Sequence, residues 1–519
     1  MPMRDEQIGQ NRVEKRVLVV SLLTVVVAVL GLNGDRWVLA QEGRWTAPTV
    51  ISAPPGFSWF PDLTVDPFGS VHVVWCLTIP LEDSPALQEQ VNYTRWDGES
   101  WSEPNDIVPR SADIVRNAIT SDQAGNIHLL FGGSVYNVLT LYYQKAPASE
   151  AWSAAAWSTP HRINQGASYI GDIAVDSQGV IHVVYDDTID YTGDGKQRWA
   201  DTFYRHSTDG GQTWSAPVNL YPEPLTRSAK PYMEIDNNDV IHVTWDERWE
   251  PFSGEKSDTY YSIYTSSSDG GKTWTPPTVI DYPQGTVVQL TVGSDGKGGV
   301  MLVWRATASD ELFYQWSTDG GHSWGVPSVI PGVFARPWTN PFDMYDMATD
   351  STGLVHLLVV GRGSQAADAL LGVYHLVWDG DHWSAPTRIF AKPGLYPEYP
   401  KIVVHEGNQL HTVWFTREGS VWDQSVTREV WYSSSQSPAP YQPVTPWPTP
   451  TPEPPTATPT SVPTATPYPT LSLEGTGLPG GLRTESDDLV RLIVALSPVV
   501  LVILVVVVVK AVGFSRLRR

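Results

Sequence analysis

The sequence predicts an all-β protein built as a seven-bladed β-propeller, and three observations predict this fold class. Aromatic and turn-forming residues are abundant, with 23 Trp, 22 Tyr, 42 Gly and 43 Pro among 519 residues, whereas only 17% of residues are charged. That composition favours many short strands joined by tight turns. One motif recurs seven times between residues 41 and 437, and a second motif follows it in most repeats.

The first motif reads Asp-x-x-Gly-x-(Val/Ile)-His and is followed by apolar residues and an aromatic residue. Its histidine position falls at His72, His128, His182, His242, Met301, His356 and His411, in steps of 54 to 60 residues. Each step accommodates four short strands, which is one propeller blade. We expect the recurring histidine to be a structural feature that contacts its own blade, rather than part of a metal ring.

The second motif is Ser-x-Asp-x-Gly-x-(Thr/Ser)-Trp. Its well-formed copies are Ser207–Trp214, Ser267–Trp274 and Ser317–Trp324, and eroded copies occupy residues 96–101 and 378–383. We expect a carboxylate to accept backbone N–H groups across a tight turn in which Gly supplies a positive φ, while the Trp plugs the blade. The structural residues predicted on this basis are Asp209, Trp214, Asp269, Trp274, Asp319 and Trp324.

The seventh repeat ends early, at Trp431-Tyr432-Ser433-Ser434, without the Trp-x-x-Pro that follows other repeats. The missing piece stands near the other end of the chain, where Trp45-Thr46-Ala47-Pro48 matches Trp214-Ser215-Ala216-Pro217. We therefore expect the N-terminal strand to complete the last blade and close the ring.

The Ser-x-Asp-x-Gly-x-Thr-Trp elements resemble the Asp boxes, or bacterial neuraminidase repeats, of the sialidase superfamily. The resemblance covers residues 41–437 and implies an Asp-box β-propeller. Asp boxes are structural in that family and lie away from its active site, so they indicate a fold far better than an activity. Familiar sialidases have six blades, whereas this sequence has seven repeats.

Both ends of the chain carry membrane signals. Residues 1–40 contain Arg12, Lys15 and Arg16, then an apolar run at 17–32, then Val38-Leu39-Ala40. This pattern is typical of a secretory signal peptide cleaved after Ala40, and the alternative is an uncleaved N-terminal anchor.

The C-terminal part predicts a tethered surface protein. Residues 438–488 form a Pro/Thr-rich stalk, residues 489–510 a transmembrane helix, and residues 511–519 a basic tail. The positive-inside rule places the C-terminus in the cytoplasm and the propeller (residues 41–437) outside it. We expect a single-pass protein of the cell membrane, on a bacterial cell surface, that contacts the membrane through this helix.

Charge and cysteine content exclude several classes of protein. The formal net charge of −22 argues against a nucleic-acid partner, which requires a basic surface to neutralise phosphates. The single cysteine, Cys76, excludes an internal disulfide and a zinc site built on several thiolates. We expect no cofactor, except that Asp186, Asp187, Asp190 and Asp194 form an acidic loop that would suit Ca²⁺ but lack the spacing of a known calcium loop.

The two faces of the ring are expected to differ. Loops entering the first strand of each blade and loops joining strands two and three share one face, here called the loop-rich face. Asp boxes and Asp-x-x-Gly turns share the opposite one, here called the turn face. Long loops at Cys76–Val91, Asp186–Asp201 and Asp246–Thr259 lie on the loop-rich face. Because long loops on a rigid scaffold tend to carry binding sites, our first hypothesis is recognition of a glycan or protein there.

The alternative hypothesis is a sialidase-like exo-glycosidase acting on sialic-acid-type glycans. The resembled enzymes use an arginine triad, a Tyr nucleophile assisted by Glu, and an Asp acid/base. By residue type and face, the clamp would be Arg305, Arg362 and Arg116 or Arg417, and the catalytic groups would be Tyr345, Glu398 and Asp62 or Asp172.

No catalytic position carries over residue by residue. The Arg-Ile-Pro motif that supplies the first arginine in the resembled family is absent from the start of the repeats, and no Tyr motif matches. The competing interpretation of these arginines is structural or rim charges. A purely structural surface protein is a third hypothesis.

Overall fold

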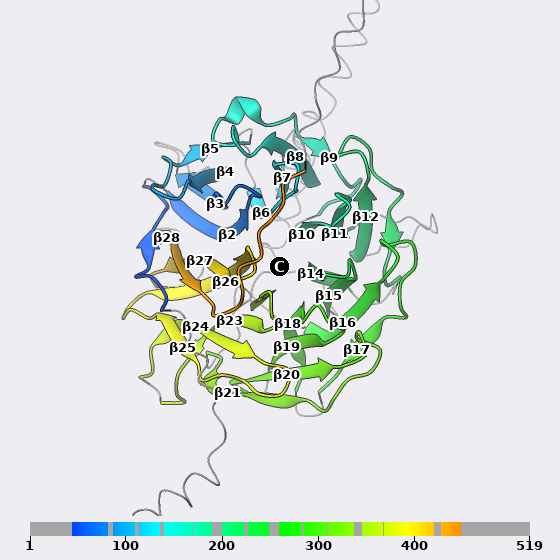
Figure 1. Cartoon of the computed structure of the whole chain (residues 1–519), viewed down its shortest axis with the longest axis vertical. Helices are drawn as coiled ribbons and strands as arrows, with labels where there is room; N and C mark the ends of the chain where they lie inside the picture. The colour runs from blue at the N-terminus through cyan, green and yellow to red at the C-terminus, as the bar shows by residue number, and fades with distance from the viewer. Residues whose placement is uncertain are drawn as a thin grey trace, which may run out of the picture. The chain divides into compact units, whose positions relative to one another are not determined.

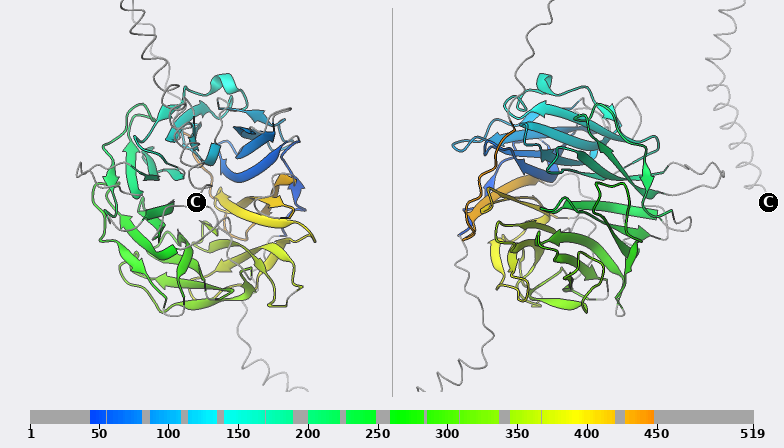
Figure 2. Two further views of the ribbon diagram at one scale, coloured as in Figure 1. Left: turned by 180° about the vertical axis from the view of Figure 1, so that it is seen from behind. Right: turned by 45° about the vertical axis from the view of Figure 1, so that its right-hand side comes forward.

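The computed structural model describes most of the repeat region. The described residues are 44–54, 56–80, 87–108, 114–134, 140–168, 170–188, 200–222, 227–248, 259–282, 285–307, 309–336, 345–366, 368–419 and 427–447. Their strands form three four-stranded and two eight-stranded sheets arranged in a ring (Figure 1 and Figure 2). Each eight-stranded sheet consists of two antiparallel four-stranded blades joined by a single residue pair, Phe57 with Arg428 or Phe334 with Arg362. The predicted all-β propeller is confirmed at this level, and the described strands group into seven blades.

The blades follow one another along the chain. Blade 1 holds β2 (Phe57–Val65), β3 (Val71–Pro80), β4 (Leu87–Trp96) and β5 (Asn105–Asp106). Blade 2 holds β6 (Ile114–Ser121), β7 (Asn126–Gly133), β8 (Thr140–Pro147) and β9 (His161–Arg162), with a short 3-10 helix, η2 (Ala154–Ala156), before β9. Blade 3 holds β10 (Gly171–Val175), β11 (Ile181–Asp187), β12 (Asp201–Ser207) and β13 (Val218–Asn219). Blade 4 holds β14 (Arg227–Ile235), β15 (Ile241–Arg248), β16 (Thr259–Ser267) and β17 (Thr278–Ile280).

The remaining blades follow the same order. Blade 5 holds β18 (Val287–Ser294), β19 (Val300–Ala306), β20 (Glu311–Ser317) and β21 (Ser328–Phe334). Blade 6 holds β22 (Asp346–Thr349), β23 (Val355–Arg362), β24 (Leu371–Trp378) and β25 (Thr387–Phe390). Blade 7 holds β26 (Tyr396–His405), β27 (Gln409–Arg417), β28 (Arg428–Gln436) and, from the other end of the chain, β1 (Thr49–Val50).

The ring closes as the sequence predicts. Strand β1 pairs with β28 in antiparallel register, with Thr49 opposite Tyr432. The backbone N–H of Thr46 donates to the carbonyl of Ser434, and that of Ile51 donates to the carbonyl of Val430. The N-terminal segment therefore supplies the fourth strand of blade 7.

The recurring histidine links the turn of its blade to the third strand. In blade 1, His72 is fully buried, its Nδ1 lies 2.7 Å from the Tyr93 hydroxyl, and its Nε2 lies 3.1 Å from Asp66 Oδ2. Blades 2 and 3 repeat this arrangement with His128 and His182. Burial lowers the pKa of His72 and His182, which keeps these rings neutral. The expected structural role is confirmed.

Each blade also inserts an indole edge-on against an aromatic ring of the preceding blade. The seven ring pairs have centroid separations of 4.8 to 6.3 Å and interplanar angles of 69 to 86°. They are Trp157–Tyr93, Trp214–Tyr143, Trp274–Tyr204, Trp324–Tyr264, Trp383–Tyr314, Trp45–His375 and Trp101–Tyr432. The motif Trp thus joins neighbouring blades, whereas the sequence placed it only within its own blade.

The Asp boxes form the tight turns expected of them. The Oδ1 atom of Asp209 accepts the backbone N–H groups of Gln212 and Thr213 and the Ser207 hydroxyl, while Oδ2 accepts the Thr213 hydroxyl. Asp269 and Asp319 occupy the same position in the next two boxes. Gly210 and Gly211 have φ of 69° and 83°, which only glycine adopts without strain.

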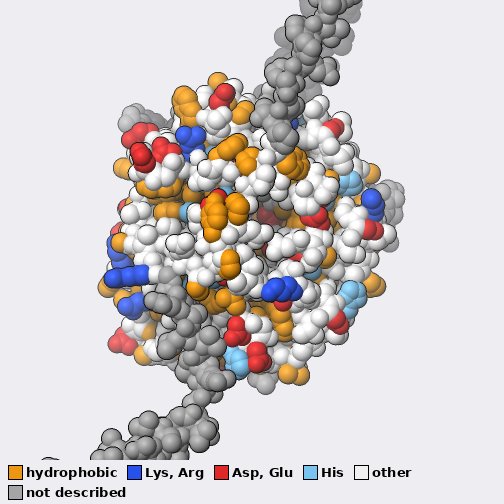
Figure 3. All heavy atoms as spheres, in the orientation of Figure 1, with side chains coloured by type: hydrophobic (Ala, Val, Ile, Leu, Met, Phe, Trp, Pro, Cys, Tyr) orange, Lys and Arg blue, Asp and Glu red, His pale blue; other side chains and the backbone are white. Residues whose placement is uncertain are grey.

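The chain after β28 lies across the turn face as a strap, defined here as Ser437–Trp447 (Figure 1, orange). Within the strap, the backbone N–H of Gln442 donates to the carbonyl of Glu406 in blade 7, and the backbone N–H of Trp447 donates to the carbonyl of Gln123 in blade 2. Hydrophobic side chains gather near the middle of this face (Figure 3). Residues 438–447, assigned to the stalk from sequence, therefore contact the propeller.

The two predicted membrane segments, 1–40 and 489–510, lie outside the described residues, as does the stalk beyond 447 and the tail at 511–519. The chain divides into one unit at 1–450 and a second at 451–519, and the second holds no described residue. Within the described ranges, no helix is long and apolar enough to cross a membrane.

Candidate functional site

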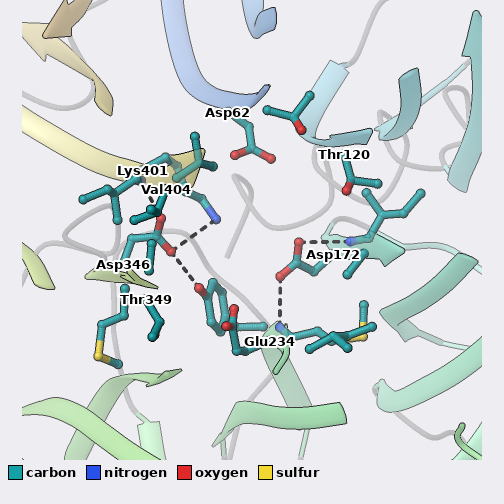
Figure 4. Close-up of a pocket in the computed structure, with 18 of the residues that line it drawn as sticks. Asp62, Thr120, Asp172, Glu234, Asp346, Thr349, Lys401 and Val404 are labelled. Atoms are coloured by element: carbon teal, nitrogen blue, oxygen red, sulfur yellow. Dashed lines mark hydrogen bonds and ion pairs between the residues drawn. The ribbon is translucent and has the colours of Figure 1, made fainter. Parts of the chain in front are cut away.

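The inner strands of the blades enclose a polar central cavity of about 310 Å³. Carboxyl groups reach it from several blades, and Figure 4 shows them converging from different strands. The acidic residues that line it are Asp62, Asp172, Glu234, Asp236 and Asp346, and the basic one is Lys401.

Three of these carboxylates hold neighbouring blades together. Asp62 accepts the N–H of Leu63 in its own strand and, at 2.9 Å, the N–H of Ile119 in blade 2. Asp172 likewise accepts from Met233 in blade 4, and Asp346 accepts from Ile402 in blade 7. These aspartates therefore bridge successive inner strands, which is a structural task.

The cavity carries more carboxyl groups than cations. Burial raises the pKa of Asp62 to about 7, and burial together with Asp346 holds the pKa of Glu234 well above its usual range. Burial opposes the charge of Lys401, but Asp346 and Asp62 hold its pKa well above the usual value. The Lys401 ammonium lies 3.9 Å from Asp346 Oδ1, so it neutralises part of the cluster.

Towards the loop-rich face the channel narrows to a cavity of about 20 Å³ lined by Arg116, Lys230 and Tyr399, among others. The guanidinium of Arg116 stacks 3.3 Å from the Phe60 ring centre. Four residues at β-bulges of the inner strands have positive φ values between 48° and 61°. They are Phe60, Lys230, Gln289 and Tyr399. Left-handed backbone at non-glycine residues costs energy, and such bulges cluster beside functional sites.

The predicted catalytic pair occupies buried contacts. The Tyr345 side chain is 1% exposed, and its hydroxyl donates to Gln289 Oε1 at 3.2 Å. Glu398 is fully buried, and its Oε1 lies 2.8 Å from Arg417 Nε and 3.3 Å from Arg336 Nη1. Glu398 thus sits between two guanidinium groups.

Each of the predicted clamp arginines makes different contacts. Arg305 is 2% exposed and lies on β19 opposite Val288 and Leu312. Arg362 donates from Nε to the Ala335 carbonyl and forms an ion pair with Asp310. Arg116 lines the narrow cavity beside the central one, with which it shares Asp172 and Lys401. Asp62, Asp172 and Arg116 thus lie at the axial cavities. A second group near Arg336 consists of Arg362, Glu398 and Arg417. Neither Arg305 nor Tyr345 lines the axial cavities or belongs to the second group.

The second group borders a basic pocket of about 220 Å³ on the loop-rich face, here called the basic pocket. It opens between the β23–β24 loop and the connection from β25 to β26. Arg336 and Arg362 are 1% and 5% exposed and form part of its lining, while Lys392 is exposed at its edge. The other residues that line it are Asp368, Ala369, Leu370, Leu371, Gly394, Leu395 and Tyr396.

Sequence reasoning missed Arg336, Lys392, Glu234 and Lys401. In blade 7, His405 occupies the Asp position of the first motif. Lys401 stands four residues before it, as Asp62 stands four residues before Asp66 in blade 1, so an alignment of the repeats would have identified Lys401. Arg336 follows the last strand of blade 5, where the repeats share no motif, and nothing in the sequence marks it.

The acidic loop proposed for Ca²⁺ is only partly described. Asp186 is 4% exposed and accepts from the Ser168 hydroxyl and the Ile170 N–H, whereas Asp190 and Asp194 lie outside the described residues. Among the residues the structure covers, no group of three or more His, Cys, Asp or Glu side chains is placed to hold a metal ion.

Several solved structures are similar to this chain. A protein of unknown function from Dyadobacter fermentans DSM 18053 is 13% identical, with 76% of this chain and 99% of that one covered and a TM-score of 0.45. The NanB sialidase of Streptococcus pneumoniae is 13% identical over 76% and 70% of the two chains, with a TM-score of 0.41. A polysaccharide lyase of family PL25, an ulvan lyase, is 13% identical over 75% and 93%, with a TM-score of 0.47.

No curated protein matches the sequence. The family described as BNR repeat-like domain matches residues 140–412, which is more than half of the chain and runs from the third strand of blade 2 to the second strand of blade 7. This match agrees with the Asp boxes at Ser207–Trp214, Ser267–Trp274 and Ser317–Trp324. The chain therefore belongs to the BNR repeat-like domain family.

Proposed function

We propose that this protein is a recognition module, held outside the cell by its C-terminal segment, whose basic pocket binds the acidic end of a glycan. The observation that carries the proposal is the pairing of Arg336 and Arg362 in one pocket with Lys392 at its edge. Guanidinium groups match carboxylate and sulfate geometry with two parallel hydrogen bonds.

The lining of the basic pocket suits a sugar as well as an anion. Leu370, Leu371, Leu395 and Tyr396 supply apolar surface for the C–H face of a pyranose ring. The volume of about 220 Å³ lies below the roughly 300–1,000 Å³ typical of drug-sized ligands, so it favours one terminal residue of a chain. A protein of net charge −22 repels anions overall, so attraction of an acidic ligand requires such a local cluster.

Binding is favoured over catalysis by the state of the predicted catalytic groups. Glu398 is fully buried between Arg417 and Arg336, and Tyr345 is 1% exposed. Neither side chain lines the basic pocket, the central cavity or the narrow cavity, whereas Arg336 and Arg362 both line the basic pocket. The sialidase-like activity remains the competing proposal, and the same experiment addresses it.

The test is calorimetric titration of the purified full chain with 3′-sialyllactose and an oligogalacturonate, and with lactose as the neutral sugar. We expect the acidic sugars to bind and lactose not to bind. Lys392→Gln and Arg362→Gln should each weaken binding by about tenfold or more, the loss typical of a charged hydrogen bond. Arg388→Gln, an exposed arginine on β25, is the matched control and should bind as the unaltered chain does.

Two outcomes would overturn the proposal. Equal affinity for acidic and neutral sugars would remove the role of the cations, as would binding unaffected by both pocket substitutions. Turnover of a fluorogenic α-sialoside, followed in parallel, would instead support the sialidase-like alternative.

A further inference from the structure

One blade departs from the aromatic pattern that the others share. In blades 1 to 5 and 7 the third-strand residue that receives the neighbouring indole is Tyr, but in blade 6 it is His375. The indole packed on His375 belongs to Trp45, in the N-terminal segment that closes the ring. The titratable ring therefore lies at the seam where the two ends of the propeller meet.

His375 is joined to a second histidine and then to a carboxylate. Its Nε2 lies 2.9 Å from His356 Nδ1, and the two rings stack with an interplanar angle of 8°. His356 Nε2 lies 3.3 Å from Asp350 Oδ2. All three residues are 2–3% exposed.

The same carboxylate also receives the start of the strap. The Ser437 hydroxyl donates to Asp350 Oδ2 at 3.2 Å, and Ser437 is 8% exposed. The backbone N–H of Ala439 in turn donates to the Ser437 hydroxyl oxygen. One buried chain of contacts thus runs from Trp45 through His375, His356 and Asp350 to Ser437.

The hydrogen-bond donors and acceptors of this series of contacts are satisfied only when both histidines are neutral. With Asp350 ionised, His356 donates from Nε2 and must accept at Nδ1, so His375 donates from Nε2. His375 Nδ1 is then an acceptor position, buried and without a hydrogen-bond partner among the described residues. A proton added to either ring leaves an N–H at His375 Nδ1, because every other nitrogen of the two rings already takes part in a hydrogen bond of this series.

The side chains paired with the two rings in the sheet are uncharged. Leu358 on β23 and Thr387 on β25 lie opposite His375 in the sheet, and Ala348 on β22 lies opposite His356. The apolar cluster around them contains Leu358, Phe390, Ile402, Leu410, Trp414 and Trp431. The titratable group facing the pair is Asp350, while the N-terminal segment contributes Trp45 and the strap contributes Ser437, both uncharged. Burial and the neighbouring His356 hold the pKa of His375 well below its usual value.

We propose that the His375–His356–Asp350 chain is an acid-sensitive latch that holds both ends of the propeller, the N-terminal closing segment and the C-terminal strap. Protonation of His375 leaves an N–H without an acceptor in the ring that packs against Trp45. Opening of the structure around this ring relieves that cost and also separates His356 from the Asp350 carboxylate that accepts from Ser437. Both ends then loosen together as the pH falls below the ordinary histidine range. The sign follows from linkage, because a group whose pKa is depressed in the fold binds its proton preferentially when unfolded.

The latch is tested by amide hydrogen exchange of the full chain, corrected for intrinsic rates, at about pH 7.5 and about pH 5.5. We expect exchange in residues 44–52 and in 437–447 to rise together, on the order of tenfold, while the core strand β15 stays protected. His375→Tyr restores the residue found in the other blades, whose hydroxyl reaches the histidine Nδ1 at 2.7 Å in blades 1 to 3. This variant should lose the acid response at both ends.

His382→Gln is the matched control, because His382 lies in the same blade with 65% of its side chain exposed, and it should respond to acid as the unaltered chain does. The proposal is overturned if His375→Tyr and the unaltered chain respond alike, or if the two ends loosen with different pH midpoints. Should His375→Tyr fail to fold, the unaltered chain decides alone. Parallel loosening with one midpoint supports the latch, and pH-independent exchange in either segment contradicts it.

Discussion

The indole of Trp101 packs edge-on against the phenol of Tyr432, with ring centroids 4.8 Å apart, and joins the first blade to the last. The same relationship recurs at each boundary between blades, so the Trp that follows each third strand is an element of ring assembly. This explains why the eroded copies lack the first Ser of the motif but keep its Trp, at Trp101 and Trp383.

Trp274→Ala tests this role. Removing the indole leaves a cavity against Tyr204 in blade 3, and we expect a loss of about 3 kcal/mol in the free energy of unfolding. Urea denaturation followed by circular dichroism measures it. Trp152→Ala removes an indole that is 56% exposed and should change stability by less than about 0.5 kcal/mol. Equal effects of the two substitutions would contradict the assembly role.

Asp209→Asn should lower the melting temperature at neutral pH and flatten its dependence on acid. Hydrogen bonds from Thr213 and Ser207 lower the pKa of Asp209 to about 2. Because the folded pKa is depressed, the stabilisation is complete above the ordinary aspartate pKa and is lost as pH falls towards 2. Thermal melts between about pH 7 and about pH 2.5 measure the difference. Asp281→Asn, at an exposed position outside the boxes, should keep the parent profile.

Lys401→Met should destabilise the protein more at high pH than at low pH. Without the ammonium, the carboxylates of Asp346 and Asp62 lose their nearest cation in the central cavity. Asp62, whose pKa burial raises to about 7, is mostly ionised at about pH 8, where we expect a cost of about 3 kcal/mol, and mostly protonated at about pH 5.5, where the cost shrinks. Urea unfolding at both pH values measures this. Lys272→Met, at an exposed position in an Asp box, should show no such pH dependence.

Glu398→Gln separates a structural role from a catalytic one. Neutralising a fully buried carboxylate beside Arg417 and Arg336 should cost about 3–5 kcal/mol of stability, because it leaves buried cations with weaker partners. Denaturant unfolding of this variant and of Glu429→Gln, a less buried site on β28, provides the comparison. Full stability in Glu398→Gln would remove the structural assignment.

The fold could be predicted because the repeats impose it at every level. The spacing of the histidines, the Asp-box turns and the match between Trp45-Thr46-Ala47-Pro48 and the internal copies all require a closed ring. The histidine contacts were also predictable in kind, since one residue type at one strand position in six repeats indicates a common packing role. The contact of each Trp with the preceding blade was not, because nothing in a single repeat specifies its neighbour.

The candidate site was only partly predictable, for a physical reason. Arg362, Glu398 and Arg417 were singled out by residue type and face. Arg336 pairs with Glu398 and lines one pocket with Arg362, but it stands at a junction without a motif and could not be predicted. The sequence analysis also assigned Tyr345 and Glu398 to one catalytic pair. In the structure Tyr345 contacts Gln289 and Glu398 contacts Arg417, at separate places in the packing of the bulged inner strands. Long-range geometry of this kind is set by blade docking, which leaves no local signature.

The strap ends on one face of the propeller. It ends at Trp447, which packs over Gly179 and donates its N–H to Gln123, both in turns on the turn face. The basic pocket is built from loops at the opposite ends of the strands, so Trp447, the last described residue, lies on the side away from the pocket. A label attached at Trp447 would therefore report on the turn face without contacting the basic pocket.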